Sequence, residues 1–403
     1  MSASPASPAP ASRPSFDPYD PLGLDDLLTE EDRAVRDTVR AWAADRVLPH
    51  VAGWYEAGEL PAARELAREL GSIGALGMPL TGYGCAGASA VQYGLACLEL
   101  EAADSGIRSL VSVQGSLAMY AIHRYGSPEQ KERWLPPMAA GEVIGCFGLT
   151  EPDHGSDPAG MRTYAKRDGT DWVLDGRKMW ITNGSLAGVA VVWAQTEEGV
   201  RGFLVPAGTP GFTAPEIHHK WSLRASVTSE LVLDGVRLPA DAVLPEAVGL
   251  RGPLSCLSHA RYGIVWGAMG AARSCFEAAL EYAKGREQFG RPIAGFQLTQ
   301  AKLADMAVEL HKGILLAHHL GGRMDAGRLR PEQVSFGKLN NVREAIGICR
   351  TARTILGANG ISLEYPVMRH ATNLESVLTY EGTVEMHQLV LGKALTGLDA
   401  FRG

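Results

Sequence analysis

The acidic side chain most in need of an explanation lies near the carboxyl end, within L-T-Y-E-G-T-V-E-M-H-Q-L-V-L-G, residues 378 to 392. Glu381 stands there between an apolar stretch and a glycine, where a helix interior gives way to a bend. A carboxylate becomes an effective general base when loss of solvent raises its pKa toward neutrality. The ordinary alternative is a solvated acid beside a C-terminal helix, because Glu is rarely buried without a partner.

Metal and disulfide chemistry are not indicated. The six cysteines are scattered without C-x-x-C spacing, and the two histidine pairs lack further ligands at the spacing of a zinc site. We expect reduced, buried thiols, structural or exposed imidazoles, and no bound metal. These residues are Cys85, Cys97, Cys146, Cys256, Cys275, Cys349, His218, His219, His318 and His319.

A glycine pattern, G-Y-G-C-A-G at residues 82 to 87, matches the G-x-G-x-x-G fingerprint of dinucleotide-binding proteins. That fingerprint must leave a β-strand and open a helix inside a βαβ unit. The preceding G-A-L-G-M-P-L-T does not read as a strand, and helical patterns lie on both sides. We therefore do not expect a nicotinamide nucleotide site here.

Composition narrows the class of protein. With 403 residues, 46% hydrophobic and 21% charged, the chain is too long for one ordinary core, and two or three domains are expected. A net charge of -7 argues against nucleic acid or an anionic membrane as the main partner, because both need basic patches. No apolar run approaches the ~18 residues of a membrane helix, so we expect no membrane insertion.

The first fifteen residues, M-S-A-S-P-A-S-P-A-P-A-S-R-P-S, are of low complexity, and we expect residues 1–15 to form a disordered tail. They contain no apolar segment typical of a secretory signal, and one arginine makes a weak transit peptide. Arg outnumbers Lys across the chain, which is typical of GC-rich bacterial genomes. These features favour the bacterial cytoplasm over the mitochondrial matrix.

Residues 16–145 read as an N-terminal helical domain and residues 146–250 as a β domain. Thr29 with Asp32 resembles a capping box, followed by apolar residues at helical spacing. In W-V-L-D-G-R-K-M-W-I-T (172 to 182), Asp175-Gly176 predicts a hairpin turn between β-formers. The stretches V-A-V-V-W-A, F-L-V-P and S-E-L-V-L-D-G-V supply more strands.

Residues 251–403 read as a C-terminal domain of long amphipathic helices. Short connections between them predict an antiparallel four-helix bundle. The whole chain is therefore expected to be α+β, in the order helices, β barrel or sandwich, helix bundle, with no parallel sheet. The two apolar stripes that indicate these helices are Leu303, Met306, Leu310 and Ile314, and Leu339, Val342, Ile346, Cys349 and Ile355.

Five long motifs occur in order: C-F-G-L-T-E-P-D-H-G-S-D-P-A-G-M (146 to 161), K-M-W-I-T-N-G (178 to 184), G-R-E-Q-F-G-R-P-I-A-G-F-Q (285 to 297), L-G-A-N-G-I (356 to 361) and Y-E-G-T (380 to 383). Together they closely resemble the acyl-CoA dehydrogenase family of flavoproteins, from about residue 25 onward. The helix, strand, helix order found from the residues agrees with that family's fold.

The resemblance implies that Glu381 is the catalytic base. It matches the glutamate of the family's Y-E-G-T motif, which removes the α proton of an acyl-CoA thioester while hydride leaves the β carbon for flavin N5. In some relatives the base instead precedes the arginine of the R-Y-G-I-V helix. That position here is Ala260, which carries no proton acceptor.

The same resemblance implies the contacts to FAD. Thr150 and Thr182 match hydroxyls at the flavin ring, with Trp180 against its face and Phe147 nearby. For Trp180 the alternative is a core aromatic in a strand. Residues expected at the FAD of a neighbouring subunit, at its pyrophosphate or at its adenosine are Arg286, Gln288, Phe289, Gln297, Gly357, Gly360, Thr383 and Glu385.

The segment L-E-L-E-A-A-D-S-G-I-R-S-L-V-S-V-Q (98 to 114) resembles the branch of the family that acts on glutaryl-CoA. There an arginine meets the distal carboxylate of the acyl group, a role that falls on Arg108. A fatty-acyl pocket has little use for a guanidinium, because a buried charge left unpaired costs about 3 to 5 kcal/mol. The alternative is an exposed arginine at a helix start. Other residues expected at the substrate are Glu101, Ser109, Ser112, Ser156, Arg261 and Tyr380.

The implied function is FAD-dependent α,β-dehydrogenation of glutaryl-CoA, with or without decarboxylation to crotonyl-CoA. The resemblance also implies a homotetramer that passes electrons to an electron-transfer flavoprotein. A dehydrogenase of another short or branched acyl-CoA, an oxidase that uses O2 and a non-catalytic scaffold remain alternatives. A non-catalytic scaffold is disfavoured because residues expected at the flavin and the base are present together: Thr150, Trp180, Thr182, Arg286 and Glu381.

Overall fold

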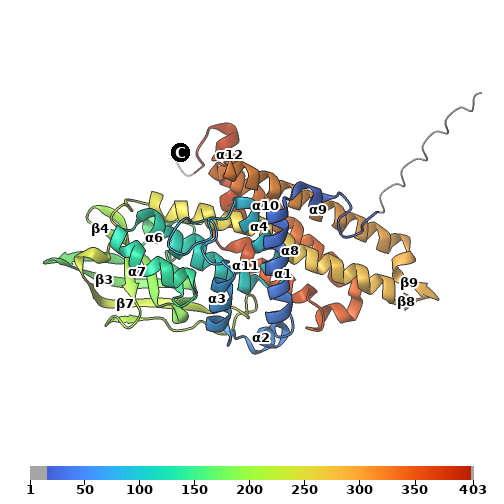
Figure 1. The fold of residues 1–403 in the computed structure, drawn as a ribbon, viewed down its shortest axis with the longest axis horizontal. Coiled ribbons are helices and arrows are strands. Elements are labelled where there is room, and N and C mark those ends of the chain that lie inside the picture. Colours follow the sequence, from blue (N-terminus) through green and yellow to red (C-terminus); the bar gives the residue numbers. More distant parts are fainter. Residues whose placement is uncertain (1–15, 401–403) are drawn as a thin grey trace, which may run out of the picture.

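The computed structural model describes residues 16–400, and the tail expected to be disordered, residues 1–15, lies outside the described residues. A sheet lies at one end of an elongated molecule, and long helices extend from it to the other end (Figure 1). Helices come first along the chain, strands second and helices last, which confirms the predicted α+β class. Within residues 16–400, no helix is long and apolar enough to cross a membrane.

The N-terminal helices begin with strong caps. In α1 the Asp32 amide donates to Thr29 Oγ1 at 3.1 Å and the Thr29 amide donates to the Asp32 carboxylate at 3.0 Å, so the predicted capping box is present. The G-x-G-x-x-G match, residues 82–87, lies in the loop that leads into α4. The helices are α1 (Glu30–Arg46), α2 (Val51–Ala57), α3 (Ala63–Ser72), α4 (Ala90–Ala103), α5 (Ser105–Ser112), η2 (Val113–Met119), α6 (Tyr120–Tyr125) and α7 (Pro128–Ala139).

The middle of the chain forms a seven-stranded sheet in the order β1-β4-β2-β3-β7-β6, with β5 paired to β4. The sheet is not a parallel sheet, as predicted, but it is mixed: β1 pairs with β4 in parallel, which the prediction did not include, and most other pairs are antiparallel. The segment that contains the β2–β3 hairpin supplies the long connection that this parallel pair needs. The strands are β1 (Gly145–Gly148), β2 (Tyr164–Asp168), β3 (Asp171–Thr182), β4 (Val189–Thr196), β5 (Gly199–Pro206), β6 (Phe212–Thr213) and β7 (Thr228–Leu238).

The Asp175-Gly176 pair does not form the predicted turn. β3 continues through it, and only the register with β7 shifts at this point. A side chain at Gly176 would lie 2.6 Å from the Cα atom of Thr163. The glycine therefore marks a bulge where another backbone segment approaches closely. The nearest hairpin turn lies instead at Gly169, between β2 and β3.

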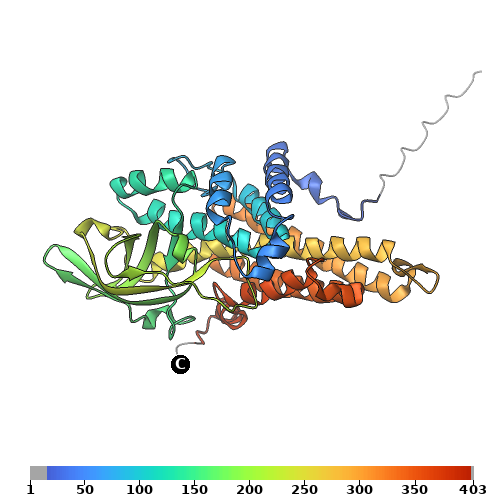
Figure 2. The ribbon, with the colours of Figure 1, turned by 90° about the horizontal axis from the view of Figure 1, so that it is seen from below.

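Long helices return after the sheet, and the two views show α8, α9 and α10 running side by side toward the end farthest from it (Figures 1 and 2). A small hairpin of β8 and β9 joins α8 to α9 at that distal end. The elements are α8 (Arg251–Gly285), β8 (Glu287–Gln288), β9 (Arg291–Pro292), α9 (Gln297–Asp325), α10 (Pro331–Leu356), η7 (Gly357–Ile361), α11 (Val367–Thr379) and α12 (Val384–Thr396).

The apolar stripe predicted for α10 is correct except at its start. Val342, Ile346 and Cys349 are buried, whereas Leu339 is only partly buried. The buried position at this end of the stripe belongs to Lys338. A lysine thus faces the interior of the bundle, where the pattern predicted a leucine.

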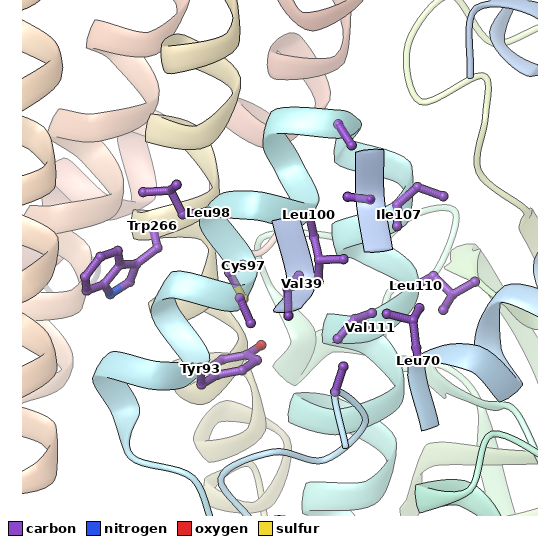
Figure 3. Close-up of a cluster of buried hydrophobic side chains, with 14 of the residues drawn as sticks. Val39, Leu70, Tyr93, Cys97, Leu98, Leu100, Ile107, Leu110, Val111 and Trp266 are labelled. Carbon is purple, nitrogen blue, oxygen red and sulfur yellow. The ribbon is translucent and has the colours of Figure 1, made fainter. Parts of the chain in front are cut away.

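Helix α4 is apolar on nearly all its faces and passes through the interior of the molecule. Leu98 of α4 lies in one buried cluster with Ile107 of α5 and Trp266 of α8 (Figure 3). Small residues let α8 approach α4 closely, since a side chain at Gly267 would lie 2.0 Å from Glu101 Oε2. This packing fixes the positions of α4 and α5, which carry Glu101 and Arg108.

Candidate active site

The α4–α5 junction places a buried ion pair at the centre of the molecule. Asp104 ends α4 and caps α5, since its Oδ1 accepts the Gly106 amide at 2.7 Å. One turn later Arg108 is 1% exposed, and its Nε donates to Glu101 Oε2 at 2.7 Å. The alternative of an exposed arginine at a helix start is therefore wrong.

Several polar atoms around this ion pair lack partners. Glu101 Oε1, Ser109 Oγ and Ser112 Oγ are buried and form no hydrogen bond within residues 16–400. Burial by itself lowers the pKa of Arg108, but the Glu101 carboxylate outweighs it and holds this pKa above its ordinary value. The site therefore keeps a charged guanidinium together with unsatisfied donors and acceptors, as a polar ligand would require.

Glu381 lies at the bend between α11 and α12, with φ of +53°. Its Oε2 atom is buried and has no hydrogen-bond partner within the described part of the chain. Burial raises the pKa of the Glu381 carboxyl. The positive charges of Arg108, Lys338 and Arg261 lower it in part without cancelling the rise. The alternative of a solvated acid is therefore wrong, and the group has the raised pKa of a general base.

The bend that carries Glu381 connects directly to the ion pair. Arg108 donates a hydrogen bond from its Nη2 to the phenolic oxygen of Tyr380, the residue immediately before Glu381. Arg261, expected near the substrate, donates from its Nε to the backbone carbonyl of Glu381 at 2.5 Å. The structure thus brings Arg108, Tyr380, Glu381 and Arg261 together, with Arg261 holding the backbone of the bend.

A second group of predicted residues lies along the end of β3. Trp180 is 59% exposed and has φ of +63°, at a break in the register between β3 and β7. The Met179 amide donates to the carbonyl of Thr150 at 2.9 Å, so Thr150 lies beside this break. Trp180 is therefore not a core aromatic. Phe147, by contrast, packs in the core, with its ring centroid 5.9 Å from that of Trp193.

The end of β3 is fixed against the arginine-bearing helix. Asn183, which follows Thr182, has φ of +67° and is buried. Its Nδ2 lies 3.4 Å from the carbonyl oxygens of Leu110 in α5 and Gly145 in β1. Thr182 therefore lies near the helix that carries Arg108, although the two residues are far apart in the sequence.

A third group lies at the distal end of the molecule and not with the other two. The β8–β9 hairpin and the neighbouring turn η7 lie far from β3 in both views (Figures 1 and 2). Phe289 is 95% exposed there, with φ of +54°. Within one chain these residues cannot meet Trp180, as the prediction of contacts to a neighbouring subunit requires. The group is Arg286, Gln288, Phe289, Gln297, Gly357 and Gly360.

The remaining predicted residues stand at the edges of the site. Ser156 is exposed in the loop between β1 and β2. Thr383 caps α12, since its Oγ1 accepts the Met386 amide at 3.4 Å. Glu385 is exposed in the first turn of α12, where its own backbone amide holds the pKa of its carboxyl below the ordinary value. None of these three positions contacts Glu381 through a side-chain hydrogen bond within residues 16–400.

The structure also brings residues to the site that the motifs did not identify. Asp104 accepts hydrogen bonds from Arg369 and from Asn373 of α11, the second at 3.0 Å, so the start of α5 is tied to the helix that leads to Glu381. Lys338 of α10 reaches the Glu381 bend itself. Lys338 stands four residues before Val342 of the buried stripe, but nothing in the local sequence shows that it is buried.

Comparison with known proteins agrees with this architecture. Models of the acyl-CoA dehydrogenase N-terminal, middle and C-terminal domains match residues 29–142, 146–236 and 248–396 in turn. The chain belongs to the acyl-CoA dehydrogenase family, whose members depend on FAD. The human mitochondrial short-chain specific acyl-CoA dehydrogenase is 34% identical over 371 residues, which cover 90% of each chain.

Two solved structures from Mycobacterium smegmatis are more similar in sequence. One, a glutaryl-CoA dehydrogenase, is 71% identical with a TM-score of 0.94, over 95% of this chain and 99% of that one. The other, a glutaryl-CoA dehydrogenase in complex with FADH2, is 64% identical with a TM-score of 0.94, over 96% of this chain and 100% of that one. These findings confirm the resemblance inferred from the motifs.

Proposed function

We propose that the chain oxidises glutaryl-CoA at its α and β carbons, with Glu381 as the base and Arg108 at the distal carboxylate. The observation that supports this proposal best is the hydrogen bond from Arg108 to Tyr380, because it joins a buried guanidinium to the residue immediately before Glu381. The similarity to two glutaryl-CoA dehydrogenases supports the same substrate.

The polar atoms around Arg108 favour a substrate with its own charge. Nε and Nη2 already donate to Glu101 and Tyr380, and Nη1 makes no hydrogen bond within residues 16–400. A carboxylate can accept from Nη1 and from the two serine hydroxyls, Ser109 and Ser112. A purely aliphatic acyl chain would instead leave these buried groups unsatisfied, at about 1 to 3 kcal/mol each.

The residues at the end of β3 fit a flavin. The hydroxyls of Thr150 and Thr182 make no hydrogen bond within the part of the chain that the structure describes, and the Trp180 indole stands exposed beside them. When FAD is bound, its ring accepts the hydride that leaves the β carbon of the substrate. Thr150 and Thr182 are free to donate to that ring, and Trp180 can cover one of its faces.

The shielded carboxylate of Glu381 also suits a decarboxylation step. In the glutaconyl thioester, cleavage of the bond to the distal carboxylate releases CO2 and leaves the electron pair delocalised toward the thioester. Protonation of the terminal carbon by Glu381 then gives crotonyl-CoA. Because Oε2 is buried, the proton taken from the α carbon can stay on Glu381 for this return.

We further propose a homotetramer that passes its electrons to an electron-transfer flavoprotein. The distal position of Arg286, Gln288 and Phe289 supports an assembly of several copies, since these residues reach a flavin at β3 only from another chain. Both the tetramer and the electron acceptor also follow from the family resemblance.

Anaerobic mixing of the flavin-loaded enzyme with glutaryl-CoA and with butyryl-CoA tests the proposal. We expect glutaryl-CoA to bleach the flavin faster and mass analysis to find crotonyl-CoA. Glutaconyl-CoA as the final product would mean that decarboxylation does not occur. Faster bleaching by butyryl-CoA would support a short-chain acyl-CoA dehydrogenase, and peroxide release in air without another acceptor would indicate an oxidase.

A further inference from the structure

A buried lysine holds the backbone on both sides of Glu381. Lys338 of α10 is 1% exposed, and its Nζ donates to the carbonyl oxygens of Tyr380 and Gly382, the second at 2.7 Å. Arg261 of α8 donates to the carbonyl of Glu381 between them. All three consecutive carbonyls of the bend therefore accept hydrogen bonds from cationic side chains of two other helices.

The conformation of the bend explains why it needs such support. Glu381 has φ of +53°, a left-handed conformation that residues with a Cβ rarely adopt. Gly382 follows with φ of +103°, and a side chain there would lie 2.9 Å from His387 Nε2. The two residues thus form a tight turn that aims the Glu381 side chain, and Lys338 bridges its flanking carbonyls.

The charge of Lys338 is not neutralised by a carboxylate in contact with it. Its hydrogen bonds within residues 16–400 go to backbone carbonyls alone. Burial therefore lowers the pKa of Lys338, to about 7, although the nearby Glu381 carboxylate opposes this. Burial of a charged ammonium group without a carboxylate partner costs free energy, and such a cost is expected where the charge serves a function.

We propose that Lys338 is a positioning residue for the catalytic base: its ammonium group holds the 380–382 bend in shape and provides a positive charge near Glu381. This inference rests on the proposed function, in which Glu381 is the base. Lys338 acts through the bend and through its charge, and touches neither substrate nor flavin in this role. The role explains why α10 carries a lysine inside its apolar stripe.

The groups that face Glu381 determine the sign of the pH effect. They are Arg108 of α5, Arg261 of α8, Lys338 of α10 and His387 of α12, with the Tyr380 phenol in the bend and Glu101 of α4 behind Arg108. Burial lowers the pKa of His387 to about 3, so this ring is neutral near pH 7. Loss of the Lys338 charge removes one of the three positive charges that lower the pKa of Glu381, which then rises further.

Replacement of Lys338 by Met and by Arg tests the inference. In Lys338→Met we expect flavin reduction to slow about 10- to 100-fold with KM changed less than threefold, because a misplaced catalytic group costs rate more than binding. The acid limb of the pH–rate profile, where the rate rises with pH as Glu381 loses its proton, should shift to higher pH by about one unit. Lys338→Arg keeps the charge and should restore the acid limb and part of the rate.

The matched control is Asn341→Leu on the same helix. Asn341 is also fully buried, and its Nδ2 donates to two backbone carbonyls, those of Val265 and Gly313, at 2.8 and 2.9 Å. Its loss should lower Tm as much as Lys338→Met does, yet leave the acid limb in place. Amide hydrogen exchange of the peptide over residues 380–387 should accelerate only in Lys338→Met.

The outcomes separate this inference from the proposed function. If Lys338→Met reduces flavin within twofold of wild type with an unmoved acid limb, while Glu381→Gln is slow, the role of Lys338 is wrong and the base assignment stands. If Asn341→Leu shifts the acid limb equally, the effect is a general loss of packing and the inference is also wrong. If Glu381→Gln itself reacts at nearly the normal rate, both fail.

Discussion

Arg108 donates a hydrogen bond to the phenolic oxygen of Tyr380, 272 residues further along the chain. Arg108 comes from α5 and Tyr380 from the bend between α11 and α12, so the contact joins the helix that we propose to recognise the acyl group to the bend that carries the proposed base. The Arg108 guanidinium also forms a cation–π contact with the Tyr380 ring, with Cζ of Arg108 5.7 Å from the ring centroid. In the proposed mechanism, acyl recognition and proton transfer therefore depend on one continuous set of contacts.

The first prediction concerns the base. Glu381→Gln should keep FAD and bind acyl-CoA, but should bleach the flavin at least ~10²-fold more slowly, the lower bound for losing a general base. The change is nearly isosteric, so Tm and flavin content should match wild type. Stopped-flow absorbance under anaerobic conditions measures the rate, and near-normal bleaching would remove the assignment.

The second prediction concerns the ion pair. Arg108→Ala should lower kcat/KM for glutaryl-CoA about 10²- to 10³-fold, within the range of about 2 to 5 kcal/mol for truncating one partner of a buried, hydrogen-bonded charge pair across a binding interface. Turnover of butyryl-CoA should fall much less. Substrate competition between the two thioesters measures the ratio directly.

A double variant separates recognition from folding. Arg108→Ala alone leaves the Glu101 carboxylate buried without its partner, which should lower Tm. Glu101→Gln combined with Arg108→Met removes both charges, so Tm should recover while the preference for glutaryl-CoA stays lost. A glutaryl-CoA rate within twofold of wild type in either variant would instead favour a short or branched acyl-CoA as the substrate.

The third prediction concerns the distal hairpin. Phe289→Asp replaces an aromatic side chain, which is 95% exposed in the single chain, with a charged one. If this ring contacts the FAD of another subunit, the variant should lose flavin and assembly together, while circular dichroism shows unchanged helix content. Light scattering measures the mass of the assembly, and the ratio of flavin to protein absorbance measures the flavin content. A flavin-loaded assembly of normal mass would contradict the shared site.

How much of the site could be predicted depended on whether a residue belongs to a contiguous motif. Glu381 and Trp180 could be proposed from the sequence because the residues around them are distinctive in order and spacing. Lys338 was not, because a lysine in a helix is normally solvated, and its burial is decided by the face that α10 turns toward the 380–382 bend. The contact between Lys338 and this bend joins segments about 40 residues apart, and the sequence around Lys338 gives no sign of it.

The same limit explains the errors in the fold. Asp175-Gly176 has strong local turn propensity, yet the approach of Thr163 turns it into a bulge within β3. The order of helices and strands was predictable because it follows from periodicity along the chain. The parallel pairing of β1 with β4 was not, because it depends on which distant strands meet.

The last prediction concerns stability in acid. Glu99 of α4 is buried, and Arg40 and Arg273 both donate to its carboxylate at distances between 2.6 and 3.1 Å. Burial by itself raises the pKa of Glu99, but the two guanidinium groups outweigh it and lower this pKa from 4.5 to about 2. A depressed pKa contributes stability above the ordinary value, and this contribution is lost as pH falls from 4.5 toward 2. The shift corresponds to about 3 kcal/mol at neutral pH.

Glu99→Gln should therefore lower the free energy of unfolding at pH 7, and the gap to wild type should narrow steadily below pH 4.5. Urea unfolding at a series of pH values measures the gap. The matched control is Glu375→Gln, which removes an exposed pair with Arg350 and should cost less than about 1 kcal/mol at any pH. A gap for Glu99→Gln that stays constant down to pH 2.5 would mean that its cost comes from packing, because most of the stability that depends on the lowered pKa of Glu99 is lost before that pH is reached.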